Sequence, residues 1–169
     1  MIEVRSAKDN DVEAMAAIYV NAAREGWVHI LGASSLEALE PPVDRLRAEV
    51  ASTDARQQVL VAEKEGRVIG FAIVRQSRDE DAHGAEVGEL DHFYSDPAVW
   101  GEGAGRKLLA VAIETLREGG FTEATLWVAE ENHRPRQIYE VAGWRYDRVT
   151  RDKPWRGGSV RDVRYRIKL

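Results

Sequence analysis

The spacing of hydrophobic residues predicts that strands and helices alternate along the chain. Apolar side chains recur at helical spacing after a run of polar residues, after a Pro-Pro pair, after a glycine-rich loop and after Asn132. Shorter runs of β-type residues lie between these segments. The expected helices cover about residues 12–26, 43–50, 106–118 and 133–142. The expected strands are 2–5, 58–63, 68–74, 85–94, 121–128, 144–150 and 160–167.

The order of these elements predicts the fold class. We expect an α/β fold (mixed α+β), in which a central mixed, twisted sheet of about seven strands is flanked by about four helices. At 169 residues the chain is long enough for a substantial core, and we expect one domain over residues 1–169. Residues 28–42 lack a clear period, and residues 77–84 and 153–158 are expected to be loops.

Composition restricts the chemistry that the chain can perform. It has no cysteine, which excludes a disulfide framework, a thiolate nucleophile and a cysteine-based metal site. The histidines are scattered without metal-ligand spacing, so we expect no metal. The sequence shows no signal-peptide pattern and no apolar run long enough to span a membrane, which makes a cytoplasmic protein the expectation.

The charge balance bears on possible partners. The net charge is −5, with 29 acidic and 24 basic residues. An acidic total argues against nucleic acid as a partner and suits an amine substrate. Basic residues do gather in the last predicted strands, from Arg145 onward. We interpret them as solvated strand faces, and a nucleic-acid surface is the weakest alternative function.

A glycine-rich loop before the third predicted helix carries the clearest chemical signal. Gly101, Gly103 and Gly105 are followed by Arg106 and an apolar-periodic helix. Such a helix start presents backbone N–H groups without internal partners beside the positive end of the helix dipole, and so favours phosphate. The dinucleotide fingerprint and the P-loop both fail, because each needs glycine at position 106. For the loop alone, a structural turn is the alternative interpretation.

The segment from Glu89 to Tyr146 resembles the GNAT superfamily of acyl-CoA-dependent N-acyltransferases. The resemblance lies in Phe93-Tyr94-Ser95-Asp96-Pro97, Trp100-Gly101-Glu102-Gly103-Ala104-Gly105-Arg106-Lys107-Leu108-Leu109, the strand Ala124 to Val128, and Asn132 with Arg136-Gln137-Ile138-Tyr139-Glu140-Val141-Ala142-Gly143-Trp144. It covers roughly the C-terminal half of the chain and implies a sheet that splays between its fourth and fifth strands. Trp100 departs from the family pattern, which usually has Gln or Arg there.

The resemblance implies acetyl-CoA, or another acyl-CoA, as the cosubstrate. It would lie where the long fourth strand and the strand of Leu126 splay apart. The main chain of Phe93, Tyr94 and Ser95 would bind the pantetheine arm. Asn132 would reach the pantetheine amide region, with a plain helix N-cap as the alternative. The diphosphate would lie against Gly101, Glu102, Gly103, Ala104, Gly105 and Arg106.

The resemblance also implies direct attack of an amine on the thioester. Glu89 matches the position of a glutamate base in several family members. Asp91 lies two residues further along the same strand, so it points to the same face, and we expect it to position the amine or a water. Tyr139 matches the tyrosine that protonates the departing sulfur. The alternatives are two solvent-facing carboxylates and a packed core tyrosine.

The other expectations concern the acceptor and the assembly. His92 is expected on the strand face opposite Glu89 and Asp91, as a packed or surface imidazole, and Trp27 is expected to line the acceptor pocket. We expect the acceptor to be the primary amine of a small molecule or peptide, and a homodimer is the default assembly. The alternative function is a non-catalytic acyl-CoA-binding or regulatory module of the same fold.

Overall fold

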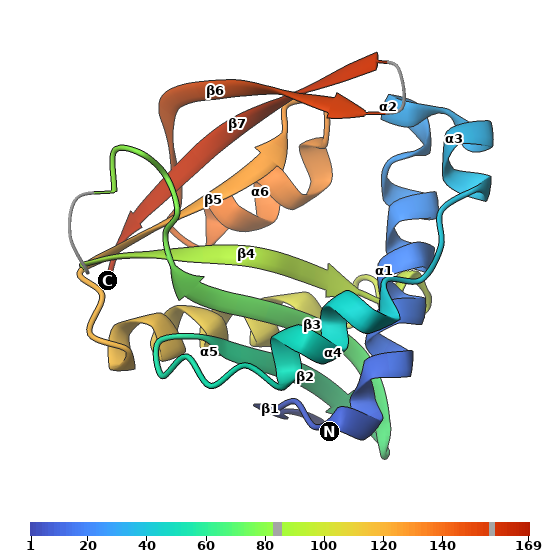
Figure 1. The fold of residues 1–169 in the computed structure, drawn as a ribbon, viewed down its shortest axis with the longest axis horizontal. Helices are drawn as coiled ribbons and strands as arrows, with labels where there is room; N and C mark the ends of the chain where they lie inside the picture. Colours follow the sequence, from blue (N-terminus) through green and yellow to red (C-terminus); the bar gives the residue numbers. More distant parts are fainter. Residues whose placement is uncertain (83–85, 156–157) are drawn as a thin grey trace.

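One sheet organises the chain. A computed structural model describes residues 1–82, 86–155 and 158–169. The strands are β1 (Ile2–Ser6), β2 (Gln58–Lys64), β3 (Arg67–Gln76), β4 (Val87–Ser95), β5 (Glu123–Ala129), β6 (Arg145–Trp155) and β7 (Gly158–Lys168). Their order in the sheet is β1-β2-β3-β4-β5-β7-β6 (Figure 1). The pairings are antiparallel except that of β4 with β5, which is parallel. The predicted mixed sheet of seven strands is confirmed.

Helices cover both faces of this sheet. They are α1 (Val12–Gly26), α2 (Val28–Leu31), α3 (Ala33–Glu37), α4 (Val43–Val50), α5 (Ala104–Glu118) and α6 (His133–Val141). In Figure 1, α1 and α4 lie in front of β2 and β3, and α5 lies behind them. No helix in the described ranges is both long and apolar enough to cross a membrane.

Two clusters of buried side chains form the core, one on each face of the sheet. Met15 and Leu46, from α1 and α4, pack against Phe71 of β3 and are fully buried. On the other face, Leu108 of α5 packs in a cluster with Trp144, which precedes β6. These faces are the apolar stripes that the helical spacing predicts. They fix the sheet between two helical layers, so the position of β4 between them is well determined.

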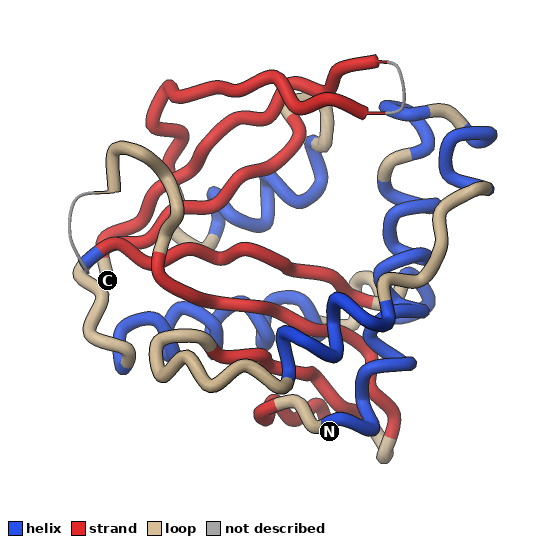
Figure 2. The backbone as a smooth tube through the Cα atoms, viewed as in Figure 1, coloured by secondary structure: helices blue, strands red, loops and turns tan. Residues whose placement is uncertain are grey.

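The sheet splays between β4 and β5. The parallel ladder joins only residues 87–89 of β4 to residues 123–125 of β5. Beyond this point the two strands diverge, as Figure 2 shows. The predicted splay between the fourth and fifth strands is therefore confirmed, and the diverging half of β4 keeps one backbone edge without a strand partner.

A β-bulge in β4 corrects the prediction for His92. Leu90 faces Val74 across the ladder and His92 faces Ile73, so Asp91 is an extra residue without a cross-strand partner. An inserted residue breaks the alternation of side chains. Asp91 and His92 consequently point to the same face, and Nδ1 of His92 lies 3.2 Å from Oδ2 of Asp91. The expected opposite face was wrong because simple alternation assumes an unbroken strand.

Two segments differ from the predicted elements. Residues 28–37, which lack a clear period, form the short helices α2 and α3. The expected loop at 153–158 instead begins inside β6, which continues to Trp155; Pro154 is tolerated because β6 is an edge strand and needs no ladder N–H there. The expected start of the fourth strand at Ala85 lies outside the described residues, as do parts of the loops at 77–84 and 153–158.

Candidate active site

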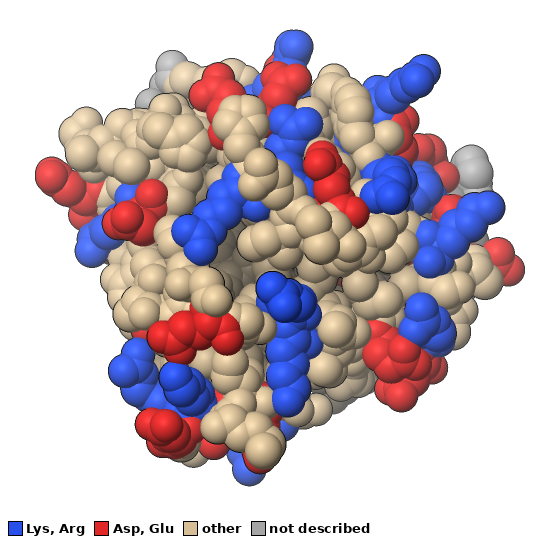
Figure 3. Space-filling view, turned by 180° about the vertical axis from the view of Figure 1, so that it is seen from behind, with Lys and Arg blue, Asp and Glu red and all other residues tan. Residues whose placement is uncertain are grey.

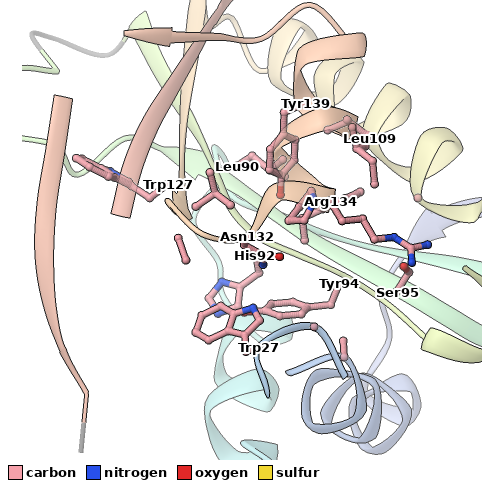
Figure 4. Close-up of a pocket in the computed structure, with 18 of the residues that line it drawn as sticks. Trp27, Leu90, His92, Tyr94, Ser95, Leu109, Trp127, Asn132, Arg134 and Tyr139 are labelled. Carbon is pink, nitrogen blue, oxygen red and sulfur yellow. The ribbon is translucent and has the colours of Figure 1, made fainter. Parts of the chain in front are cut away.

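A cavity of about 1370 Å³ occupies the region where β4 and β5 diverge. Its walls come from β4, the loop before α5, the start of α6, the end of α1 and the last part of β6. In Figure 4, Trp27, His92, Tyr94, Asn132 and Tyr139 surround one common space. Seen from behind, the molecule has a hollow near the middle of the surface with basic side chains beside it (Figure 3).

The glycine loop forms one end of this cavity. Gly103 is the N-cap of α5 with φ 92°, and Gly101 has φ 93°. A Cβ atom at either position would meet nothing within 4 Å, so the missing side chains leave open space there. The helical N–H series begins with Lys107, which donates to the Gly103 carbonyl at 3.0 Å. The N–H groups before it lack helical partners, so the predicted phosphate cradle fits a diphosphate.

Two of the predicted loop residues do not line the cavity. The Glu102 N–H donates to the Val99 carbonyl at 3.2 Å, and its carboxylate pairs with Nζ of Lys64 at 2.8 Å. Ala104 packs its methyl group into the core. Glu102 therefore offers the cavity neither its N–H nor its side chain, whereas Ala104 keeps a main-chain N–H in the first helical turn. Spacing alone does not reveal which loop amides are already used inside a turn.

The open edge of β4 lies along the middle of the cavity. Phe93, Tyr94 and Ser95 pair with β3 on one edge, and β5 has already diverged on the other. All three line the cavity. Unpaired backbone groups on a strand edge can accept an extended partner as an added strand. The position of these residues suits the amides of a pantetheine arm.

Asn132 and Trp100 lie near this arm position. Asn132 occupies the N-cap position of α6, and its side chain makes no capping hydrogen bond. Nε1 of Trp100 donates to the Ser95 carbonyl at 3.1 Å. The guanidinium of Arg134 lies 4.3 Å from the Trp100 ring centre. Arg134 thus places a positive charge beside Trp100, the position at which the family pattern usually has Gln or Arg. This role of Arg134 was not predicted from the sequence.

Glu89 is the buried carboxylate of the site. Its residue is 7% exposed, and it lines the cavity beside the last paired rung of β4. Oε2 accepts a long hydrogen bond of 3.4 Å from the Arg78 N–H. Burial raises the pKa of the Glu89 carboxyl, and the negative charge of Asp91 raises it further. A carboxylate with a raised pKa is a stronger base than an exposed one.

Asp91 has the opposite electrostatic character. Its carboxylate contacts NH2 of Arg75 and NH2 of Arg78, each at 3.1 Å, besides the His92 ring. Burial alone would raise the pKa of Asp91, but the contact with His92 and the charges of His92, Arg75 and Arg78 together lower it to about 2. Asp91 therefore stays ionised and is a poor proton acceptor near neutral pH.

Tyr139, on α6, lines the same cavity as Glu89. Its ring packs against Phe93, Trp144 and Tyr165, with centroid distances of 5.8, 6.4 and 6.5 Å. The ring is buried, yet in Figure 4 its hydroxyl points into the cavity. Burial raises the pKa of the Tyr139 hydroxyl, so it remains protonated at neutral pH and can donate.

Aromatic side chains enclose the far end of the cavity. The rings of Trp27 and Trp155 lie 6.1 Å apart, and Trp127 lies under the guanidinium of Arg151 at 4.1 Å. All four residues line the cavity. Trp27 therefore lines the cavity, and its contact with the acceptor stays a prediction. The contributions of Trp127 and Trp155 were not predicted, because the strands that carry them are brought together only by the fold.

Other charged groups are engaged elsewhere. Four basic residues of β6 and β7 form ion pairs with carboxylates; these are Arg151, Arg161, Arg164 and Arg166. Arg151 and Arg161 are about half exposed, as expected for solvated strand faces, whereas the Arg164 side chain is buried. Within the described ranges, no group of three or more His, Asp and Glu side chains is arranged to hold a metal ion.

Comparison with known proteins identifies the family from the sequence. The Acetyltransferase (GNAT) family profile matches residues 12–144. Phosphinothricin N-acetyltransferase of Alcaligenes faecalis is 34% identical over 118 residues, which are 69% of this chain and 55% of that protein's length. An N-acetyltransferase of Archaeoglobus fulgidus is 28% identical over 94% of this chain and 98% of its own.

A solved structure shares the fold over the whole chain. The PaiA N-acetyltransferase of Thermoplasma acidophilum, solved in complex with coenzyme A, superposes with a TM-score of 0.80 at 20% identity, covering 100% of this chain and 99% of the other. The family match spans both helical layers, the splay and the glycine loop. The chain therefore belongs to the GNAT acetyltransferase family and is an acetyl-CoA-dependent acetyltransferase.

Proposed function

We propose that the protein transfers the acetyl group of acetyl-CoA to the primary amine of a small molecule or peptide by direct attack. The observation that carries the proposal is Glu89, a buried carboxylate with a raised pKa that lines the same cavity at the splay as Tyr139. A base on one side and a proton donor on the other suit the two proton movements of amide formation from a thioester.

The proposed position of acetyl-CoA follows the three parts of the cavity. The diphosphate lies at the N-terminus of α5, against Gly101, Gly103 and the first amides of the helix. The pantetheine arm runs along the open edge of β4, with Asn132 beside it. This arrangement points the thioester toward the region between Glu89 and Tyr139. A main-chain N–H of β4 there can polarise the thioester carbonyl.

The proposed reaction removes two protons from the amine nitrogen and adds one to the departing sulfur. Glu89 takes a proton from the ammonium form of the acceptor, directly or through a water, and leaves a neutral amine. The amine nitrogen attacks the thioester carbon, and the carbon–sulfur bond breaks as the tetrahedral intermediate collapses. Glu89 has by then passed the first proton to solvent, so its carboxylate accepts the second proton of the nitrogen. The sulfur leaves as a thiolate that Tyr139 protonates, and the tyrosinate regains a proton from Glu89 through water. The products are the acetamide and coenzyme A.

The base matters because an alkyl amine is charged at neutral pH. With a pKa of about 10.4, only about one molecule in 2,500 is neutral at pH 7, which corresponds to roughly 4 to 5 kcal/mol. Glu89 offsets much of this cost by accepting the proton inside the cavity. Asp91 assists electrostatically, since its negative charge raises the pKa of Glu89 while its own carboxylate is held by Arg75 and Arg78.

Replacing Tyr139 with phenylalanine is expected to reduce kcat about 10- to 100-fold without changing the KM for acetyl-CoA. The effect is at the low end for a general acid because a thiol of pKa about 8.5 is already a good leaving group. Steady-state kinetics with both substrates varied measures it. With activated thioesters, whose thiols are more acidic, the kcat values of the wild type and the variant should lie closer together. An equal loss of kcat with every thioester would contradict the acid role of Tyr139.

Replacing Trp27 with alanine is expected to raise the KM for the acceptor about tenfold, because the substitution removes one wall of the aromatic end of the cavity. The KM for acetyl-CoA should stay within about twofold. Tyr146→Ala is the matched control, since this aromatic side chain is half exposed on β6 and does not line the cavity. An acceptor KM unchanged in Trp27→Ala would place the acceptor elsewhere.

The proposed function is tested by following the release of free thiol from acetyl-CoA with a panel of primary amines, together with mass spectrometry of the amine. We expect at least one amine to gain an acetyl group in equal amount to the thiol released. Binding of acetyl-CoA with background thiol release for every amine would instead support the alternative, a non-catalytic acyl-CoA-binding module.

A further inference from the structure

The segment that follows β3 crosses the splayed region instead of turning directly into β4. We call residues 77–82, which are the described part of this connection, the strap. Its first residue hydrogen-bonds to β4, with the Ser77 N–H donating to the Val87 carbonyl at 2.8 Å. Oγ of Ser77 lies 3.4 Å from Oγ1 of Thr125 on β5. The strap therefore begins at β4 and reaches β5.

One arginine on the far strand fastens the strap. The side chain of Arg164, on β7, is 3% exposed. Its two terminal nitrogens bind both carboxylate oxygens of Asp81 at 2.6 and 2.7 Å, and NH1 also contacts Asp79 at 3.2 Å. Its Nε donates to Asp147 of β6 at 2.7 Å. A buried guanidinium satisfied on all sides in this way holds its partners in one geometry.

Asp79 also links the strap to the aromatic wall of the cavity. Asp79 accepts a hydrogen bond from Nε1 of Trp127 at 2.9 Å and another from Oγ1 of Thr125 at 3.3 Å. The Trp127 ring in turn lies 5.6 Å from the Arg164 guanidinium. Three strands, β5, β6 and β7, thus hold one short segment of backbone.

The held segment covers the candidate base. Arg78, which lies between Ser77 and Asp79, places its main-chain N–H 3.4 Å from Oε2 of Glu89 and its guanidinium 3.1 Å from Asp91. Glu89 is 7% exposed under this cover. Within the described part of the chain, the hydrogen bonds of Arg164 go to Asp79, Asp81 and Asp147 rather than to Glu89, so we expect its influence on the reaction to pass through the strap.

We propose that Arg164 is a positioning residue: by clamping the strap through Asp79 and Asp81, it keeps water from Glu89 and so maintains the basicity that the reaction uses. This inference rests on the proposed function, in which Glu89 is the base. It assigns a role to a salt-bridge cluster that lies outside the cavity's reaction centre.

The charges around Glu89 determine the sign of the effect. Burial is the largest influence and raises its pKa, and the charges of Asp91 and Asp79 act in the same direction. The Arg78 charge and N–H act in the opposite direction. Releasing the strap hydrates Glu89 and removes Asp79 and Arg78 together, while Asp91 stays. Because burial dominates, the pKa of Glu89 falls toward that of an ordinary carboxyl group.

The first test measures Glu89 directly and needs no activity. The side-chain carboxyl carbon of Glu89 is followed by carbon-13 NMR through a pH titration, and its signal is assigned from its absence in Glu89→Gln. In Arg164→Met, the Glu89 carboxyl should titrate at lower pH than it does in the wild type. Arg161→Met is the matched control, because this arginine lies on the same strand in an exposed pair with Asp152 and should leave the titration unchanged.

A second variant covers the case in which Arg164→Met does not fold. Asp81 is 53% exposed, so Asp81→Asn removes one carboxylate from the clamp with little cost to folding. It should shift the Glu89 titration in the same direction by a smaller amount. An unchanged Glu89 titration in folded Arg164→Met, or in Asp81→Asn when the former is unfolded, would overturn the proposal.

Kinetics then separates this inference from the proposed function. The clamp variants should lower kcat/KM for the acceptor roughly three- to tenfold, move the acidic limb of its pH profile to lower pH, and leave the KM for acetyl-CoA unchanged. A purely structural cluster would lower the melting temperature without moving that limb, and that result would contradict the positioning role. If the Glu89 titration shifts while the acidic limb of the pH profile stays in place, Arg164 does shield Glu89 from water, but Glu89 is not the base of the reaction.

Discussion

Glu89→Gln is expected to reduce kcat/KM for the acceptor roughly 100- to 1,000-fold at pH 7, which is the range for loss of a general base. Glutamine keeps the shape of the side chain but cannot accept the proton of the ammonium group. The binding of acetyl-CoA should be unchanged, because the diphosphate and the pantetheine arm are held by other parts of the cavity. Stopped-flow or steady-state thiol release measures the loss.

The pH dependence makes this prediction specific. In the wild type the acidic limb of the profile should follow the Glu89 titration, at a pH above that of an ordinary glutamate because burial raises its pKa. The variant should lose this limb and approach the wild-type rate near pH 11, where most of an amine with a pKa of about 10.4 is neutral. Glu123→Gln is the control, a β5 carboxylate paired with Arg166 outside the cavity. A constant deficit at every pH would contradict the role of Glu89 as the base.

Gly103→Val is expected to weaken the binding of acetyl-CoA roughly 10- to 100-fold, or about 1.4 to 2.8 kcal/mol. A β-branched residue does not adopt φ 92° readily, so the loop relaxes away from the conformation that aligns its amides. The added methyl groups also enter the space left open at this position. Isothermal titration calorimetry with acetyl-CoA measures the loss directly.

Gly66→Val separates the two parts of this effect. Gly66 has φ 77° and equally open surroundings, but it lies in the turn between β2 and β3, away from the cavity. Its substitution should cost comparable stability while leaving the affinity for acetyl-CoA within about twofold. If both variants lose the same affinity for acetyl-CoA, the loss reflects general destabilisation. If Gly103→Val binds acetyl-CoA as tightly as the wild type, the loop at Gly103 does not bind the diphosphate.

The sequence was most informative where chemistry and backbone conformation depend on local residues. The glycines at 101 and 103, the amphipathic helix after them and the tyrosine on α6 all follow from short-range spacing, and the structure brings them around one cavity. The hydrophobic alternation also placed most strands to within a few residues. Glu89 and Tyr139 lie 50 positions apart in the chain, and only the family resemblance linked them.

Features that depend on long-range packing were not predictable in this way. The bulge at Asp91 arises from the register of β4 against β3, and it reversed the expected face of His92. The hydrogen bond that occupies the Glu102 N–H depends on the turn after Pro97. The strap was recognised only as a polar loop, because its partners on β5 and β7 follow it by more than 40 residues.

The acceptor end of the cavity shows the same limit. The position of Trp27 after the first helix predicts that it lines the acceptor pocket. Its neighbour Trp155 comes from the last hairpin, and Trp127 comes from β5. No spacing in the sequence connects these indoles. The identity of the amine is therefore a question for substrate panels, guided by the aromatic walls.

A crystal structure with coenzyme A bound tests the proposed arrangement most directly. We expect the diphosphate at the amides that follow Gly101, the pantetheine arm paired with the open edge of β4, and the sulfur atom between the Glu89 carboxylate and the Tyr139 hydroxyl. Coenzyme A bound with its sulfur remote from both side chains, or outside the cavity between β4 and β5, would contradict it.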